Sequence, residues 1–471
     1  MSGLRILLFS SPEGLAGGQL KKPVFGIQPL GLLYLASALR KWADFEYNLK
    51  VIDAYTLGYN RDDIKGVISS FHPDIVGVSS ITIRIYDANY ICSIAKEVNS
   101  DTITVVGGPH ASSIPLDIIN YPDTDIFVVG EGEITFLEIC RAVYTQKGWD
   151  SIAGIVYKKS GKVITNERRE AIKDLDTIPF PDSSLLPHLE SYNPLPHWGR
   201  NGHFSMMVTT RGCSYTCRFC SIVITQGRKY RFQSPESIIE QIIGLKKLGV
   251  DSIAFRDGTF TTNRPRVVDF CNLLIKGKFN LNWSCNCRAN ELDFELLKLM
   301  KEAGCYMVSL GIEHGNSELL WQYKRLTKEQ VTNALKYARQ IGIDVTGYFI
   351  LGVPEDDLTT LRETIEFAKS LPLNNASFTI LTPFPGTDIY DYCKQKGLLL
   401  GVGWDKFDAT GGLCWRHPSL TEKQLLSMLK RAYREFYLRP SIIVNKISKI
   451  KTLKDITNYI RLALELFRRG H

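Results

Sequence analysis

Residues 206–220 read Met206-Met-Val-Thr-Thr-Arg211-Gly-Cys213-Ser-Tyr-Thr-Cys217-Arg-Phe-Cys220, an apolar run followed at once by a loop that carries three cysteines. The apolar run is typical of a buried strand. The three thiols are spaced four and three residues apart. Because thiolates select zinc, copper or iron–sulfur clusters, this stretch predicts a metal centre at the carboxyl end of a strand.

The number of thiols indicates which metal the loop holds. A structural zinc site needs four tetrahedral ligands, and the loop supplies three. Cys285 and Cys287 could complete a zinc site from another strand, so zinc stays an alternative. Three ligands on a four-iron cluster leave one iron open to a substrate or cofactor. We therefore expect Cys213, Cys217 and Cys220 to hold a catalytic [4Fe-4S] cluster.

A regular alternation of strands and helices continues after the thiol loop. The spacing of the strands suits βα units of roughly 30 residues, and Ser234 with Pro235 marks the start of one helix between them. The pattern predicts a partial (β/α)6 barrel of the TIM type over residues 201–400, with its chemistry at the carboxyl ends of the strands. The strands are expected to begin near Met206, Ser252, Asn282, Met307, Asp344 and Ser377.

Residues 1–145 form a second alternating series. Short apolar runs, buried on both faces, alternate with amphipathic stretches. They predict a doubly wound, Rossmann-like α/β domain that binds its ligand beyond the carboxyl ends of its strands. Residues 146–200 are rich in proline and are expected to be a linker with a hairpin near 154–164. The expected strands are Leu4–Phe9, Leu49–Ile52, Ile75–Val78, Thr104–Val106 and Ile126–Val129, and the expected helices are Leu30–Lys41, Arg61–Ser70, Tyr86–Val98 and Ile134–Tyr144.

Composition and charge limit the class of protein. The chain has 471 residues, of which 44% are hydrophobic and 23% charged. These are ordinary globular values, which exclude disorder and collagen. No uncharged apolar run is long enough for a transmembrane helix, and the first apolar run is too short for a secretory signal. We expect a cytoplasmic protein whose 11 cysteines stay reduced.

The net charge of +8 lies entirely in the C-terminal part of the chain. Residues 421–471 hold 12 Lys plus Arg and 4 Asp plus Glu, so the rest of the chain is balanced. Residues 401–471 are expected to be helical and basic. Such a mixture is typical of an amphipathic helix on a membrane and also of a packed helix with a solvated rim. The first alternative implies peripheral contact with the inner face of a membrane and a lipid-like substrate.

The thiol loop, with Phe219 before its last cysteine and a partial βα barrel behind it, resembles the radical S-adenosylmethionine (SAM) superfamily. The resemblance implies that the open iron chelates SAM and that an electron from the cluster cleaves SAM to a 5′-deoxyadenosyl radical, which abstracts a hydrogen atom from the substrate. It also implies an electron donor such as flavodoxin or ferredoxin. The positions that it assigns to SAM are Phe219, Asp257, Gly258, Arg288, Glu313 and Gly352.

Four of these SAM positions also have a structural alternative. Phe219 could be a core aromatic residue. Arg288 and Glu313 could form an ion pair with each other across the barrel mouth, and Gly352 could serve only to shape a loop.

The doubly wound domain ahead of the barrel makes residues 1–440 resemble the cobalamin-binding radical SAM enzymes, which include class B methyltransferases and the anaerobic magnesium-protoporphyrin ester cyclase. Small residues after the strands would let a flat ring approach the backbone, although tight turns without a ligand are the alternative. The positions that the resemblance assigns to cobalamin are Tyr55, Ser79, Ser80, Gly107, Gly108, Pro109, His110, Gly130 and Glu131.

The corrinoid signature Asp-x-His-x-x-Gly is altered in this chain. It reads Asp53-Ala-Tyr55-Thr-Leu-Gly58, with tyrosine in the histidine position. Neutral tyrosine is a poor ligand for cobalt, so we expect cobalamin to bind without a histidine from this motif. His110 is another imidazole in the domain, and a turn histidine that only donates or accepts hydrogen bonds is its alternative role.

The resemblance implies that methylcobalamin gives its methyl group to an unactivated carbon of a small molecule after hydrogen abstraction. Three alternatives stay open: an oxidative cyclase, a methylthiotransferase-like enzyme that modifies transfer RNA, and a corrinoid or iron–sulfur sensor without turnover. The C-terminal region lacks the interleaved aromatics of a small RNA-binding barrel, so nucleic acid is not the expected partner.

Overall fold

The computed structural model describes residues 3–21, 26–186, 192, 203–408 and 413–448. The chain forms two compact units, and each is described on its own. The first unit contains residues 1–194, 211–214 and 221–233, and the second contains 195–210, 215–220 and 234–471. The chain therefore passes from one unit to the other several times around the three cysteines.

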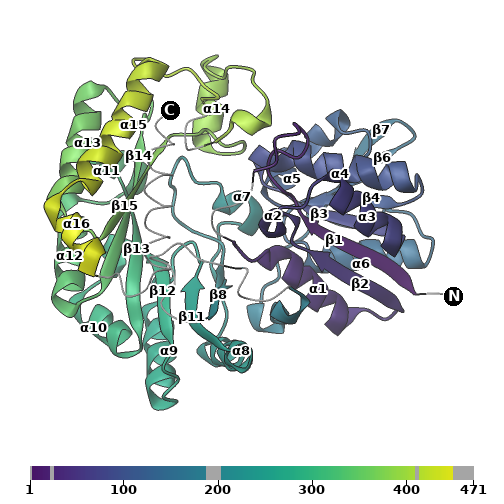
Figure 1. Cartoon of the computed structure of the whole chain (residues 1–471), viewed down its shortest axis with the longest axis horizontal. Coiled ribbons are helices and arrows are strands. Elements are labelled where there is room, and N and C mark those ends of the chain that lie inside the picture. Colours follow the sequence, from purple (N-terminus) through teal and green to yellow (C-terminus); the bar gives the residue numbers. More distant parts are fainter. Residues whose placement is uncertain (1–2, 22–25, 187–191, 193–202, 409–412, 449–471) are drawn as a thin grey trace. The chain divides into compact units, whose positions relative to one another are not determined.

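The first unit is built on a seven-stranded sheet (Figure 1). Its strands are β1 (Leu4–Ser10), β2 (Tyr47–Ile52), β3 (Ile75–Ser79), β4 (Ile103–Gly107), β5 (Ile126–Val128), β6 (Ile155–Lys159) and β7 (Lys162–Thr165). They lie in the order β2-β1-β3-β4-β5-β6-β7. Strands β1 to β5 are parallel, and β6 and β7 are antiparallel. The hairpin expected within the linker thus extends this sheet.

Helices cover both faces of the first sheet (Figure 1), which confirms the doubly wound fold. Helices α1 (Leu30–Trp42) and α6 (Glu133–Tyr144) pack together on one face, and α3 (Arg61–Phe71) and α4 (Ile85–Val98) pack together on the other. Two short helices, α2 (Ala54–Leu57) and α5 (Pro109–Ser113), were not expected. Because β1 lies between β2 and β3, the sheet has a switch point of the kind at which α/β sheets bind ligands.

The second unit is built on a six-stranded parallel sheet, as expected for a partial barrel. Each strand begins within three residues of its expected start. The strands, in the order β15-β14-β13-β12-β11-β8 across the sheet, are β8 (His203–Met207), β11 (Val250–Phe255), β12 (Asn282–Cys287), β13 (Cys305–Glu313), β14 (Asp344–Leu351) and β15 (Asn375–Ile380).

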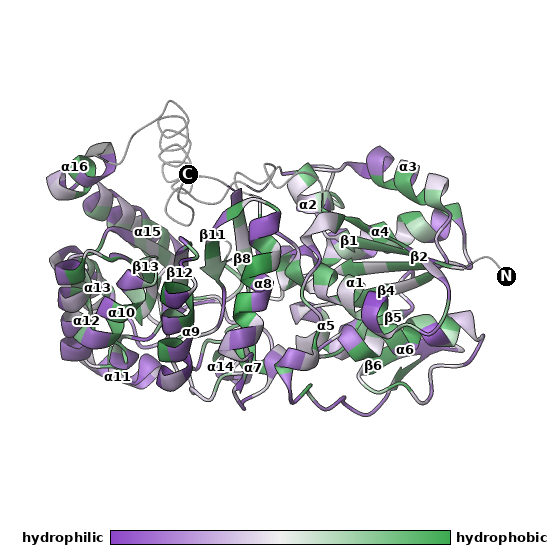
Figure 2. Cartoon of the chain, turned by 90° about the horizontal axis from the view of Figure 1, so that it is seen from below, coloured by the Kyte–Doolittle hydropathy of each residue, from purple (hydrophilic) through white to green (hydrophobic). Residues whose placement is uncertain are grey.

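Amphipathic helices surround this sheet, and the outer sides of α11 and α12 are largely hydrophilic in Figure 2. Helix α8 begins as expected, with Pro235 in its first position and the Ser234 hydroxyl accepting a hydrogen bond from the Ser237 N–H. The helices are α8 (Pro235–Lys247), α9 (Arg264–Lys276), α10 (Phe294–Glu302), α11 (Ser317–Lys324), α12 (Lys328–Ile341), α13 (Leu358–Ser370), α14 (Asp388–Gln395), α15 (Glu422–Tyr437) and α16 (Pro440–Ser448).

Aromatic packing joins the second sheet to its helices. The rings of Phe255, Phe260, Phe270 and Trp283 lie with centroids 4.7–5.7 Å apart, and all four are fully buried. Offset and edge-to-face pairs of this kind stabilise a core beyond the area that they bury. They fix β11, β12 and α9 together, and these strands lead into the candidate site.

Short elements flank the three cysteines in sequence. Strands β9 (Thr210–Arg211) and β10 (Arg231–Phe232) form a two-stranded ladder, and helix α7 (Ile222–Gln226) packs on α5 of the first unit. In the described part of the chain, no helix is long and apolar enough to cross a membrane. The end of the basic tail, on which the expected membrane contact rests, lies outside the described residues.

Candidate active site

The loops after β3 and β4 bring several of the expected cobalamin residues together at the carboxyl edge of the first sheet. The Ser80 N–H donates a hydrogen bond to the Gly107 carbonyl at 2.9 Å. Gly108 has φ +107°, and a Cβ there would lie 2.5 Å from the Ser80 carbonyl oxygen. The close contact between these two loops therefore requires glycine at position 108. Gly130, after β5, has φ +86° and no atom within 4 Å of an added Cβ, so this part of the edge is open.

The altered corrinoid motif forms helix α2. The Asp53 carboxylate caps the helix by accepting from the Thr56 N–H at 3.3 Å, and Gly58 ends it with φ +66°. Tyr55 donates its backbone N–H to the Ser10 hydroxyl at 3.1 Å. The guanidinium carbon of Arg84 lies 3.6 Å from the centroid of the Tyr55 ring. The motif thus presents a phenol covered by a cation where the corrinoid signature has an imidazole.

His110 is completely buried and held by structural contacts. Its Nε2 lies 3.1 Å from the Asp117 carboxylate, which also accepts a hydrogen bond from the Tyr121 hydroxyl at 2.8 Å. The His110 ring packs edge-on against Phe127. The structure therefore gives this histidine the hydrogen-bonding role that the sequence left as its alternative.

Glu131 lies in a buried ion-pair network of the first unit. Its carboxylate accepts from two nitrogens of Arg231 at 2.7 and 2.9 Å, and Arg211 lies 3.4 Å away. Arg211 also donates to Glu133 at 2.5 Å. Burial would raise the pKa of Glu131, but the Arg231 hydrogen bonds and the charges of both arginines outweigh it and lower the pKa. The resemblance assigns Glu131 to cobalamin, and no local sequence pattern indicates these two arginine partners, which lie before and after the three cysteines.

The three cysteines remain thiols rather than disulfides, and each is half-buried. The Cys213 N–H donates to the Gly227 carbonyl at 3.1 Å, and its sulfur lies 3.4 Å from the Tyr230 hydroxyl. Gly212 has φ +89°, and a Cβ there would lie 2.0 Å from the Lys229 carbonyl oxygen. The turn before the first cysteine is therefore restricted to glycine.

The donor set fits an iron–sulfur cluster by its chemistry. Three thiols lie on one loop, and Cys217 accepts a charged hydrogen bond from Arg288, whose NH1 is 3.7 Å from the sulfur. Hydrogen bonds to the ligand sulfurs are among the contacts that tune such clusters. Among the residues that the structure describes, no three His, Cys, Asp or Glu side chains are already gathered closely enough to hold a metal. Binding would therefore have to gather the ligands, as metal sites commonly do.

Cys285 and Cys287, the candidates for completing a zinc site, lie in the core of the second unit with their sulfurs 3.4 Å apart. Burial raises the pKa of the Cys285 thiol well above its ordinary value. A thiol that resists deprotonation is a poor metal ligand. Both cysteines are therefore part of the packed core of this unit.

Glu313 pairs with Lys324 rather than with Arg288. The Lys324 ammonium lies 2.8 Å from the Glu313 carboxylate and 5.8 Å from the centroid of the Phe219 ring. Burial would lower the pKa of Lys324, but the nearby Glu313 and Cys217 outweigh it and raise the pKa. Arg288 donates to the Lys324 carbonyl at 2.5 Å and stacks on Tyr215. No sequence pattern indicates Lys324 as the partner, because it follows Glu313 by 11 residues and lies at the end of a different element, α11.

Asp257 is fully buried and accepts hydrogen bonds from the backbone before the thiol loop. The N–H groups of Thr209 and Thr210 donate to it at 2.6 and 2.8 Å, and the Thr209 hydroxyl donates at 2.7 Å. Burial raises the pKa of Asp257 despite the nearby Arg266. The carboxylate thus fixes the turn between β8 and the thiol loop. Gly258 directly follows Asp257 in the segment after β11.

Gly352 shapes the loop after β14. Its N–H donates to Asp356 at 2.8 Å, its φ is +79°, and an added Cβ would lie 2.8 Å from Leu425. Both the conformation and the close neighbour favour glycine here.

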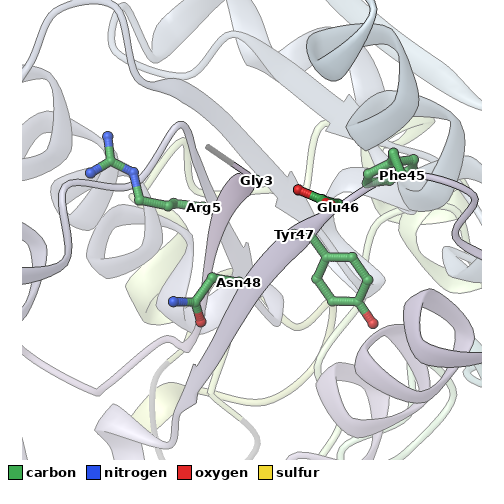
Figure 3. Close-up of a pocket in the computed structure, with 6 residues that line it drawn as sticks. All are labelled: Gly3, Arg5, Phe45, Glu46, Tyr47 and Asn48. Atoms are coloured by element: carbon green, nitrogen blue, oxygen red, sulfur yellow. The ribbon is translucent and has the colours of Figure 1, made fainter. Parts of the chain in front are cut away.

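A separate hollow of about 590 Å³ opens at the amino ends of β1 and β2 (Figure 3). Arg5, at its edge, pairs with Asp74 at 3.8 Å. Sheets of this type bind their ligands at the carboxyl ends of the strands, so the hollow lies outside the candidate site. It is lined by Gly3, Arg5, Phe45, Glu46, Tyr47 and Asn48.

Comparison with known families and proteins covers both units. Residues 207–368 match the family model of the Radical SAM superfamily, and residues 20–140 match that of the B12 binding domain. Over 422 residues the chain is 35% identical to an uncharacterized methyltransferase of Pyrococcus horikoshii. The aligned region covers 89% of this chain and 90% of that protein. It is 30% identical over 432 residues to the anaerobic magnesium-protoporphyrin IX monomethyl ester cyclase of Rubrivivax gelatinosus, with 90% of this chain and 76% of that protein covered.

A solved structure shares the fold. It is the radical S-adenosylmethionine methyltransferase TsrM from Kitasatospora setae, with cobalamin and a [4Fe-4S] cluster bound. The superposition has a TM-score of 0.72 and covers 94% of this chain and 90% of that one. At 18% sequence identity the likeness concerns the architecture alone.

Proposed function

Because the chain belongs to the cobalamin-binding radical S-adenosylmethionine enzymes, we propose that it transfers a methyl group to an unactivated carbon of a small molecule. The cofactors of this family are a [4Fe-4S] cluster, SAM and cobalamin. When bound, the cluster and SAM supply a radical that abstracts hydrogen, and cobalamin supplies a transferable methyl group. The observation that carries the proposal is the similarity to a methyltransferase over nine-tenths of both chains, across both units.

The side chains of the second unit have defined roles in this proposal. Cys213, Cys217 and Cys220 would hold the cluster, and Arg288 donates a charged hydrogen bond to the Cys217 sulfur. The buried pair of Lys324 and Glu313 places compensated charges close to the Phe219 ring. Polar groups held rigidly in a buried site bind and orient a charged cofactor without reorganising.

The side chains of the first unit favour cobalamin that would bind without a histidine from the corrinoid motif. Tyr55 replaces the histidine of the corrinoid motif and is covered by Arg84. His110 is buried against Asp117 and Phe127. The open backbone at Gly130 would let a flat ring approach the strand ends there.

The proposals for the substrate and the electron donor rest on the composition of the C-terminal region and on the chemistry of the cluster, and not on side-chain contacts. We propose a lipid or another hydrophobic small molecule as the substrate, because the basic and apolar C-terminal sequence suits a membrane surface. A one-electron protein donor of the flavodoxin or ferredoxin class would reduce the cluster.

Oxidative ring closure is the second candidate function. The 30% identity to the magnesium-protoporphyrin ester cyclase over most of the chain favours it. A cyclase and a methyltransferase of this family would share the same three thiols and the same doubly wound unit, so the two functions differ in product rather than in cofactors.

The experiment that separates these functions compares cells with and without the gene. The protein is first purified anaerobically, reconstituted with iron and sulfide, and assayed for corrinoid. Lipids and pigments are then compared by mass spectrometry. A gene-dependent gain of one methylene supports methyl transfer, and a loss of hydrogens supports cyclisation. A reconstituted protein that never releases 5′-deoxyadenosine with any extract would show that the proposal is wrong and would favour a sensor.

A further inference from the structure

Four hydroxyl groups converge on the carboxylate of Glu291 in the second unit. Oε1 accepts hydrogen bonds from Tyr215 and Thr262, both at 2.7 Å. Oε2 accepts from Thr259 at 2.7 Å and from Thr261 at 2.6 Å. A carboxylate offers about four acceptor positions, so these hydroxyls use its whole hydrogen-bonding capacity.

This carboxylate joins three segments that lie far apart in sequence. Thr259, Thr261 and Thr262 belong to the loop after β11, Glu291 to the turn after β12, and Tyr215 to the thiol loop. Hydrogen bonds to an ionised acceptor are shorter and stronger than neutral ones. The thiol loop is therefore tied to the carboxyl ends of two strands through a single side chain.

Tyr215 carries this connection to a cysteine. The guanidinium carbon of Arg288 lies 3.6 Å from the centroid of the Tyr215 ring, which is a close cation–π contact. The same guanidinium reaches the Cys217 sulfur at 3.7 Å and donates to the Lys324 carbonyl at 2.5 Å. A contact path thus runs from Glu291 through Tyr215 and Arg288 to Cys217.

We propose that Glu291 is a positioning residue for the cysteine centre: it fixes the Tyr215 ring, and the ring holds the Arg288 guanidinium against the Cys217 sulfur. The inference rests on the proposed role of the cysteines as cluster ligands. Hydrogen bonds and positive charge at a ligand sulfur stabilise the reduced form of a cluster and raise its reduction potential. Releasing Arg288 from this position lowers the potential.

Three variants separate the steps of this path. Glu291→Gln removes the anionic acceptor, and Tyr215→Phe removes the hydroxyl but keeps the ring under Arg288. Tyr215→Leu removes both the hydroxyl and the ring. Tyr157→Phe is the matched control, because Tyr157 in the first unit donates to Asp150 at the same 2.7 Å.

The test is an anaerobic redox titration of the reconstituted full-length protein, followed by electron paramagnetic resonance without substrate. Iron and sulfide content are measured alongside. We expect the cluster potential to shift to more negative values in Glu291→Gln and Tyr215→Phe, and furthest in Tyr215→Leu. Tyr157→Phe should match the wild type. Loss of iron from Glu291→Gln but not from Tyr157→Phe supports the same role, since the loop would then no longer present its ligands.

Unchanged potential, spectrum and iron content in Glu291→Gln and Tyr215→Phe would overturn the inference. Tyr215→Phe keeps the test decisive if Glu291→Gln fails to fold, because it deletes one oxygen and retains the stacked ring. If the wild type binds no cluster, the proposed function has failed first, and the positioning role is rejected with it.

Discussion

The ammonium of Lys324 lies 2.8 Å from the carboxylate of Glu313, and the two side chains are only 13% and 9% exposed. Removing one member of a buried ion pair leaves the other charge without compensation, which costs about 3–5 kcal/mol. Lys324→Met should therefore lower the free energy of unfolding by about this amount, measured by urea denaturation of the full chain. The double variant Lys324→Met/Glu313→Met should recover most of the loss. Additive losses would contradict a coupled pair.

A methyl group at Gly212 should disturb the thiol loop. An added Cβ would lie 2.0 Å from the Lys229 carbonyl oxygen, in a backbone conformation with φ +89°. Gly212→Ala should reduce the iron bound per chain after reconstitution. Gly342→Ala, at the end of α12, is the control, because its φ of +78° gives backbone strain of about 1–2 kcal/mol, but its Cβ meets no atom within 4 Å. Equal iron content in the two variants would count against a steric restriction at Gly212.

Cluster assembly should depend on Cys217. Cys217→Ala removes the thiol that accepts the Arg288 hydrogen bond, and we expect no cluster and no formation of 5′-deoxyadenosine. Cys92→Ala removes a thiol that is buried in the first unit, and it should assemble the cluster normally. Iron and sulfide analysis with product chromatography measures both. Retention of cluster and product in Cys217→Ala would mean that the loop is misassigned.

Acid should weaken the first unit through Glu131. The pKa of this carboxyl lies below its ordinary value of 4.5 because the charges and hydrogen bonds of its arginine partners outweigh burial. Its contribution to stability is therefore complete above the unfolded-state pKa and is lost as the pH falls through the lower folded-state pKa.

Glu131→Gln should be less stable at neutral pH, by about 3–5 kcal/mol, with a flatter loss of stability in acid. Denaturant midpoints from pH 7 down to pH 3 measure both effects. If the stability of the variant falls with pH as steeply as that of the wild type, other carboxyl groups cause the acid sensitivity.

Sequence periodicity was sufficient to predict the two sheets, because strands buried on both faces leave continuous apolar runs. The hairpin at residues 155–165 was expected within a linker. Its strand β6 has Ile155, Val156 and Tyr157 buried against the sheet, a placement that depends on tertiary packing and has no local signal. Helix α2 formed because Asp53 caps it and Gly58 ends it, inside a stretch analysed only as a ligand motif.

The thiol loop was predictable because its three ligands lie within eight residues. Its supporting contacts were not, because they join distant positions. Arg231 follows Glu131 by 100 residues, and Glu291 follows Tyr215 by 76. The Gly-Glu-Gly-Glu stretch that ends at Glu133 suggested a cofactor turn, yet its two acids have arginine partners that no local pattern indicates.

The return of the chain to the first unit at residues 211–214 and 221–233 restricts how such enzymes can recombine. A hybrid joined near residue 200 would inherit Glu131 and Glu133 from one parent and Arg211 and Arg231 from the other. Unless both parents share all four residues, the crossover separates acids from the bases that neutralise them. The first unit therefore cannot be exchanged between such enzymes by a single crossover, and these four positions have to be exchanged together.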